Sequence, residues 1–260
     1  MTKILAVTNQ KGGVGKTTTA VNLAASLAAA KQRVLLIDLD PQGNATMGSG
    51  IDKRDLRASI YEVLLGSKSI VEARIHADAG KYDLLPANRD LAGAEIELVD
   101  IPHREMRLRD ALKSVAAEYE FVLIDCPPAL NLLTLNGLCA AKSVMIPMQC
   151  EYYALEGLSD LVNTIRKVRA NLNPELEIEG LLRTMFDPRN ALAQQVSDQL
   201  EEHFGDKVYR TVIPRNVRLA EAPSFGVPVL YHDKLSRGTQ AYLALAGELL
   251  NNAAQPTALV

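Results

Sequence analysis

The chain begins with a short apolar segment, a glycine-rich loop and a helical pattern, in that order. Residues 4–8 are mostly apolar, the loop reads Gln10-Lys11-Gly12-Gly13-Val14-Gly15-Lys16-Thr17-Thr18, and residues 17–30 are rich in alanine and leucine. Glycines let backbone N–H groups turn toward phosphate oxygens, and the N-terminus of the following helix adds its positive end. This order of strand, loop and helix predicts a phosphate-binding site for a nucleotide.

Two side chains of the loop have the chemistry that a nucleoside triphosphate and its metal require. Lys16 is placed to reach the β- and γ-phosphates, and the Thr17 hydroxyl is placed to bind Mg²⁺. The common pattern G-x-x-x-x-G-K-[ST] has a glycine where this chain has Gln10. Five further residues are expected to line the nucleotide phosphates: Gly12, Gly13, Val14, Gly15 and Thr18.

Aspartates end two of the other apolar segments. Asp125 ends residues 121–125, and Asp38 ends residues 34–38 with Asp40 two positions later. Open α/β sheets bind ligands at the carboxyl ends of their strands, so we expect Asp125 to hold Mg²⁺ through water. Asp38 and Asp40 alternate and point to different sides, so one can serve the metal and the other the attacking water. Helix caps and turns are the alternative roles for these aspartates.

Short apolar segments alternate with longer helical patterns along the chain, and several are apolar at consecutive positions, as in strands buried on both faces. The expected strands are residues 4–8, 34–38, 82–86, 121–125, 144–148, 178–185, 209–213 and 227–230. The expected helices are residues 17–30, 155–172, 191–204 and 238–250. This alternation predicts a doubly wound α/β fold with a mostly parallel sheet flanked by helices. We expect one domain over residues 1–250 and a flexible tail over 251–260.

Composition excludes several other classes of protein. The chain has 260 residues and a net charge of −3, which excludes a globally basic nucleic-acid binder but leaves room for a local basic patch. No stretch approaches about 18 uninterrupted apolar residues, so no membrane span is expected, and the N-terminus does not read as a signal peptide. The cysteines lack metal-ligand spacing and predict buried thiols: Cys126, Cys139 and Cys150. The histidines are expected at the surface: His76, His103, His203 and His232.

Four segments together resemble the ParA/Soj chromosome-partitioning ATPases. The loop is similar to the deviant Walker A motif, with Lys11 as its extra lysine. Residues 38–44, Asp-Leu-Asp-Pro-Gln-Gly-Asn, are similar to the second motif, and residues 121–128, ending Asp-Cys-Pro-Pro, are similar to Walker B. The loop alone also fits MinD, the nitrogenase iron protein and arsenite-pump ATPases, whereas residues 212–224 favour ParA/Soj. The resemblance covers about residues 3–250.

The resemblance implies a mechanism in which ATP is held between two facing subunits. Lys11 would reach the phosphates of the partner subunit, while the second loop lysine acts within its own subunit. Asp40 would position the attacking water, and Gly12 would lie where the two subunits approach most closely. Pro214 and Asn216 would contact the adenine. A lysine from the partner would neutralise charge on the γ-phosphate as an arginine finger does, which ties hydrolysis to dimerisation.

The family also implies that the ATP-bound dimer binds double-stranded DNA without sequence preference. Residues 207–237 contain two acidic residues and six basic ones: Lys207, Arg210, Arg215, Arg218, Lys234 and Arg237. Such a segment can contact phosphates, although it can equally be an ordinary solvated face. By resemblance, Arg189 and Arg218 fall at DNA-contact positions, and Arg215 lies in the same basic segment. A ParB/Spo0J-type centromere-binding protein would stimulate hydrolysis, and the protein would be cytoplasmic and associated with the nucleoid.

Other functions need features that this sequence lacks or leaves open. A MinD-like membrane ATPase needs a basic amphipathic helix at its C-terminus, and this chain has no Lys or Arg after Arg237. An iron–sulfur reductase needs paired cysteines at a dimer face, and Cys139 and Cys150 have no matching context in this sequence. A scaffold that binds ATP without hydrolysing it is disfavoured by Lys11 and Asp40. ATPases that position other cargo without DNA share these motifs and remain the alternative.

Overall fold

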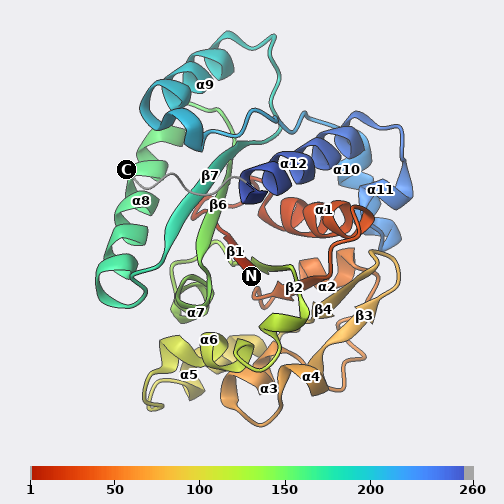
Figure 1. Cartoon of the computed structure of the whole chain (residues 1–260), viewed down its shortest axis with the longest axis vertical. Helices are drawn as coiled ribbons and strands as arrows, with labels where there is room; N and C mark the ends of the chain where they lie inside the picture. The colour runs from red at the N-terminus through yellow and green to blue at the C-terminus, as the bar shows by residue number, and fades with distance from the viewer. Residues whose placement is uncertain (1, 255–260) are drawn as a thin grey trace.

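The computed structural model describes residues 2–254, and this part of the chain contains a seven-stranded sheet in the order β3-β4-β2-β5-β1-β6-β7 (Figure 1). Every neighbouring pair is parallel except β3 and β4. The predicted doubly wound α/β fold is therefore confirmed. The strands are β1 (Lys3–Val7), β2 (Val34–Asp38), β3 (Ile75–Ala77), β4 (Tyr82–Leu85), β5 (Phe121–Asp125), β6 (Ser143–Met148) and β7 (Glu177–Arg183).

Helices cover both faces of the sheet, and several begin at sequence-encoded caps. Ser59 with Glu62, and Ser69 with Glu72, form capping boxes that start α3 and α4. The α-helices are α1 (Lys16–Ala29), α2 (Asn44–Gly48), α3 (Ile60–Leu65), α4 (Ile70–Ala73), α5 (Leu91–Glu97), α6 (Arg107–Leu112), α7 (Leu132–Ala140), α8 (Ala154–Asn171), α9 (Ala191–Phe204), α10 (Val217–Glu221), α11 (Val229–His232) and α12 (Arg237–Ala254). Short 3₁₀ turns are η1 (Arg104–Met106), η2 (Ala116–Glu118), η3 (Gly205–Lys207) and η4 (Ala222–Phe225).

Each face of the sheet carries its own apolar core, because successive side chains of a strand point to opposite faces. In β1, Leu5 and Val7 belong to the core beneath α1 and α12, whereas Ile4 and Ala6 belong to the core on the other face. Helices α1 and α12 lie side by side on their face, and α6 and α7 pack together on the other (Figure 1). Burial on both faces explains why these strands are apolar at consecutive positions.

Two of the predicted strands are wrong. Residues 209–213 run beside β7 without forming a strand, because the side chain of Glu248 accepts the hydrogen bonds of the Arg210 and Thr211 backbone N–H groups. Residues 227–230 instead enter α11, whose N-cap is Pro228. The short antiparallel edge strand β3 was not predicted, and neither were the helices between β2 and β6.

The C-terminal helix is longer than the sequence suggested. α12 continues to Ala254, four residues past the expected end of the domain at residue 250. The remainder of the predicted tail, residues 255–260, lies outside the described residues. Among the described residues, none of the helices has both the length and the apolar composition needed to cross a membrane.

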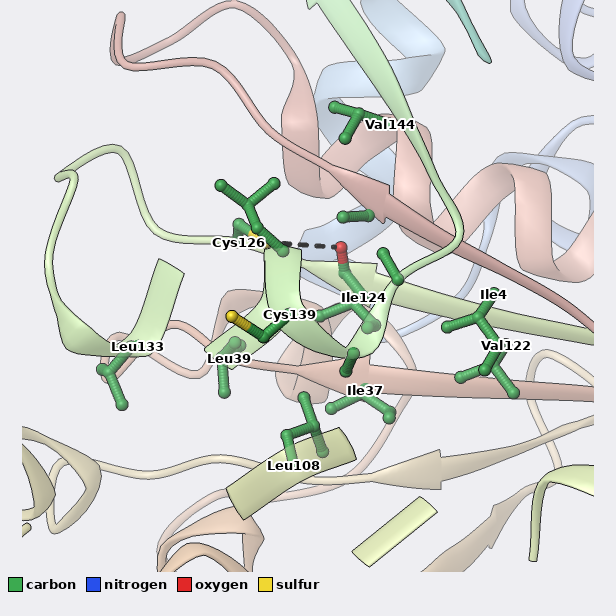
Figure 2. Close-up of a cluster of buried hydrophobic side chains, with 14 of the residues drawn as sticks. Ile4, Ile37, Leu39, Leu108, Val122, Ile124, Cys126, Leu133, Cys139 and Val144 are labelled. Atoms are coloured by element: carbon green, nitrogen blue, oxygen red, sulfur yellow. Dashed lines mark hydrogen bonds between the residues drawn. The ribbon is translucent and has the colours of Figure 1, made fainter. Parts of the chain in front are cut away.

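All three cysteines are free and buried, as predicted. Cys126 and Cys139 lie among apolar side chains such as Leu39, and the Cys126 thiol donates a hydrogen bond to the Ile124 carbonyl (Figure 2). Burial raises the pKa of all three thiols, to about 11 for Cys139 and Cys150. Three of the histidines are exposed, as expected, while His232 is half-buried and stacks on Phe225.

Candidate functional site

The glycine-rich loop joins the carboxyl end of β1 to the start of α1. Gly13 and Gly15 have φ angles of 76° and 87°, a left-handed conformation that residues with a side chain rarely adopt. Gly15 is the N-cap of α1 and has no side chain that could cap the helix. The first N–H groups of α1 therefore make no hydrogen bond to a capping side chain. Apart from the glycine itself and its two chain neighbours, a Cβ added at Gly12 would meet no atom of residues 2–254 within 4 Å. The loop therefore has the backbone of an anion site.

The ends of two neighbouring strands hold this loop in place. Asn9 donates from Nδ2 to the Pro147 carbonyl at 2.8 Å and accepts at Oδ1 from the Lys11 N–H at 3.0 Å. Thr184, just after β7, donates from Oγ1 to the Val14 carbonyl at 2.7 Å. The loop is thus fixed by side chains from outside it, and neither Asn9 nor Thr184 was picked out from the sequence.

The two loop lysines point to different environments. Lys16 is buried, with 7% of its surface exposed, and its Nζ donates to the Lys11 carbonyl at 3.1 Å. Burial lowers the pKa of Lys16, and the carboxylates of Asp125 and Asp40 oppose this shift. The Lys11 side chain is 48% exposed and its Nζ lies 2.5 Å from Oε2 of Glu151. One lysine therefore faces inward to the loop, and the other lies at its outer rim.

Asp125 ends β5 at the same edge of the sheet, as predicted. Both of its carboxylate oxygens are buried, and neither has a hydrogen-bond partner among residues 2–254. Burial raises the pKa of Asp125 well above its usual range, and the neighbouring Asp38 adds to the shift. A buried carboxylate without partners is costly, and the water shell of a magnesium ion beside Thr17 would satisfy it. No cluster of three acidic, histidine or cysteine ligands occurs within residues 2–254.

The two aspartates after β2 have different surroundings. Asp38 is fully buried and accepts hydrogen bonds from the Thr46 N–H at 2.8 Å and the Thr46 hydroxyl at 2.7 Å. Burial raises the pKa of Asp38 to about 6, against these hydrogen bonds. Asp38 therefore anchors α2, and its role as a metal ligand stays a prediction. Asp40 is half-buried, so it is more exposed to solvent than Asp38, and it accepts the Gln42 N–H at 2.9 Å.

The residues predicted to contact adenine, Pro214 and Asn216, lie in a segment that runs beside the residues just after β7. Phe186 donates its N–H to the Ile213 carbonyl at 3.0 Å, and Phe186 and Pro214 form an isolated parallel bridge. Asn216 caps α10, with its Oδ1 accepting the Leu219 N–H at 3.3 Å. The adenine contacts of Pro214 and Asn216 stay predictions.

The same bridge brings two of the predicted DNA-contact residues together. Arg189 precedes α9 in a loop and donates to both oxygens of Asp187 at 2.7 and 2.9 Å. Arg215 is exposed on the neighbouring segment and contributes to lowering the pKa of Asp187, behind the larger effect of Arg189. Arg189 and Arg215 thus share one acidic neighbour.

Arg218 lies in α10 and is paired with acidic residues on two sides. Its guanidinium lies 2.8 Å from Glu221 and 3.3 Å from Asp233. These are the two acidic residues of the basic segment 207–237. The other five basic side chains of that segment have no ion pair among residues 2–254.

Known proteins are similar to this chain in sequence and in fold. The family described as AAA domain matches residues 2–178. The chromosome partitioning protein ParA of Caulobacter vibrioides is 54% identical over 96% of this chain and 94% of its own length. The sporulation initiation inhibitor protein Soj of Bacillus subtilis is 54% identical over 97% of this chain and 100% of its own length. A structure of cobyrinic acid a,c-diamide synthase from Mycobacterium smegmatis with bound ADP and magnesium is 40% identical, with a TM-score of 0.85 over 97% of this chain and 96% of that one.

Proposed function

Because the chain belongs to the ParA/Soj family of chromosome-partitioning ATPases, we propose that it is an ATP-dependent switch that dimerises around nucleotide. In this proposal ATP binding joins two subunits, and the dimer binds DNA without sequence preference. A ParB-type partner stimulates hydrolysis, which releases the protein from the nucleoid. The biological result is segregation of a chromosome or plasmid.

The contrast between the two loop lysines is the main support for this proposal. Lys16 is buried against its own loop, so its ammonium is placed for phosphates of its own subunit. Lys11 is half-exposed at the rim and faces Glu151 instead of the loop interior. A lysine that serves the facing subunit has to leave its own loop in this outward direction. The exposed aromatic pair Tyr152 and Tyr153 lies next to Glu151 in the chain and gives this rim apolar surface.

The remaining site residues have distinct roles in the proposed hydrolysis. Thr17 and Asp125 would hold Mg²⁺, which neutralises phosphate charge when it is bound. Asp40 is half-buried and would orient the attacking water. Lys16 stabilises charge on the phosphates in its own subunit, and Lys11 adds the second positive charge from the partner.

The proposed DNA surface consists of Arg189, Arg215 and Arg218. Their guanidinium groups would contact backbone phosphates, which carry no sequence information. Doubling this surface in a dimer raises the number of phosphate contacts, so affinity for DNA should depend on the nucleotide that drives dimerisation.

The proposal is tested by measuring binding to a non-specific duplex without nucleotide, with ADP and with ATP, over a series of salt concentrations. We expect the protein to bind the duplex only when ATP is present. We expect its affinity for the duplex to fall steeply as the salt concentration increases. Binding that is absent in every nucleotide state would contradict the DNA-dependent role. That result would favour a MinD-like or other cargo-positioning ATPase, which liposome binding would then test.

A further inference from the structure

Glu151 is the acidic residue that holds the outward-facing loop lysine. It lies in the turn between β6 and α8, and its Oε2 is 2.5 Å from Nζ of Lys11. Its side chain is 51% exposed, so the pair lies at the surface rim of the site. Another bond holds the end of β6 to the loop, since Asn9 donates to the Pro147 carbonyl. The turn is therefore well placed to control where the Lys11 ammonium lies.

The Glu151 carboxylate and the phosphates of a facing subunit are both anions, so they would compete for the positive charge of the Lys11 ammonium. We infer that Glu151 is a positioning residue, which holds Lys11 in the separate subunit and releases it when a nucleotide-loaded partner competes for it. The inference rests on the proposed function, because it assumes that Lys11 serves the partner. Glu151 thereby sets the protein concentration at which ATP produces a dimer.

The size of this effect follows from exposure and symmetry. Half-exposed ion pairs are weak because water and salt screen them. A two-fold dimer breaks two such pairs, one in each subunit. Removing the carboxylate should therefore tighten the dimer by roughly two- to thirty-fold, a range that corresponds to two weak surface pairs.

The experiment compares Glu151→Gln with the wild type by sedimentation, using a non-hydrolysable ATP analogue with Mg²⁺ over a series of protein concentrations. The amide keeps the size of the side chain and removes its charge. Glu156→Gln is the matched control, because Glu156 is an exposed acid in the first turn of α8, without an ion pair among residues 2–254. We expect Glu151→Gln to dimerise at lower protein concentration and the control to match the wild type. Glu151→Gln dimerising like the wild type, or more weakly, would overturn the inference.

A second measurement tests the contact without requiring dimerisation. In the nucleotide-free protein, the rate at which an amine-reactive reagent labels Lys11 should rise several-fold in Glu151→Gln, while other surface lysines keep their rates. An unchanged Lys11 rate would show that Glu151 does not hold the lysine. A wild type that fails to dimerise with the analogue would instead count against the proposed function, so the two failures are distinguishable.

Discussion

The phosphate loop and the basic segment 207–237 differ in how much of their structure can be read from the local sequence. The backbone conformation of the loop is set by its own residues, because Gly13 and Gly15 take left-handed φ angles. The basic segment has a charge surplus in the sequence, but Arg218 is held by both acidic residues of that segment. Arg189 is likewise held by Asp187, two residues earlier.

The difference shows what a motif establishes and a charge count does not. A loop motif specifies a conformation, whereas a surplus of basic residues says nothing about which of them are free. In this protein both arginines that the family implies for DNA contact, Arg189 and Arg218, have acidic partners, while Arg215 has no ion pair within residues 2–254. The loop should therefore respond to substitution through nucleotide binding, and the basic segment through competition between carboxylates and DNA phosphates.

The largest expected effect is on the buried loop lysine. Lys16→Ala should weaken ATP binding by at least about 30-fold, because it removes one partner from a buried charge interaction. Lys11→Ala should leave ATP binding by the single subunit within a few-fold of the wild type, since Lys11 faces away from its own site. Calorimetric titration with ATP measures both. Equal losses in the two variants would remove the distinction between inward and outward lysines.

The next effect separates two glycines of the same loop. Gly12→Val should fold and bind ATP normally, because a Cβ there meets no atom of the described residues within 4 Å beyond its own chain neighbours. It should weaken the ATP-dependent dimer by about ten-fold or more through a clash with the partner. Gly15→Ala should instead destabilise the folded subunit by about 1–2 kcal/mol, because its φ of 87° is left-handed. Thermal unfolding and sedimentation give the two readouts. Normal dimerisation by Gly12→Val would show that Gly12 does not lie where the two subunits approach most closely.

Reversing the charge of a basic residue should affect DNA and leave the dimer intact. Arg189→Glu and Arg218→Glu should each reduce DNA affinity by about ten-fold, and each should lower the slope of log affinity against log salt by about 2, one phosphate contact per subunit. Sedimentation with ATP analogue serves as the control for dimerisation. Full DNA affinity in either variant would show that its arginine is not a contact residue.

The smallest effect comes from removing an acidic partner. Asp187→Asn should raise DNA affinity by a few-fold, because Arg189 no longer has to leave a carboxylate. The Arg189 guanidinium lowers the pKa of Asp187 to about 2. This carboxylate is therefore ionised above that pH, and acidifying from pH 8 to pH 5.5 should not reproduce the gain. A gain of the same size on acidification alone would mean that another group controls Arg189.

Much of the fold was predictable because its strands are apolar at consecutive positions. The central strands β1, β2, β5 and β6 and the long helices α1, α8, α9 and α12 all match expected segments to within a few residues. Residues 209–213 were misread because an apolar pattern does not reveal that the carboxylate of Glu248, far along the chain, binds their N–H groups. The short helices α2 to α6 bury few apolar positions each, so periodicity gives them little signal.

The site divides in the same way. The loop and Asp125 were predictable, because a glycine motif and a strand-ending acid are local features. The environment of Asp38 was not, since its partner Thr46 lies in a separate helix. Glu151 was also missed, because it meets Lys11 only when β1 and β6 pair in the sheet. The sequence signal for Glu151 was its position just after a predicted strand, at the edge where ligands bind.

The most direct test of the central claim, that Lys11 serves the facing subunit, is a mixing experiment with two inactive variants. Lys11→Ala lacks the donated lysine, and Asp40→Ala should bind ATP and dimerise but hydrolyse poorly. In a mixed dimer, the Lys11→Ala subunit keeps its own Asp40 and receives Lys11 from its partner. Equal mixing with duplex DNA present should therefore restore roughly a quarter of wild-type turnover, for random assortment into two-fold dimers. Turnover no greater than that of the separate variants, with mixed dimers shown to form, would contradict the account.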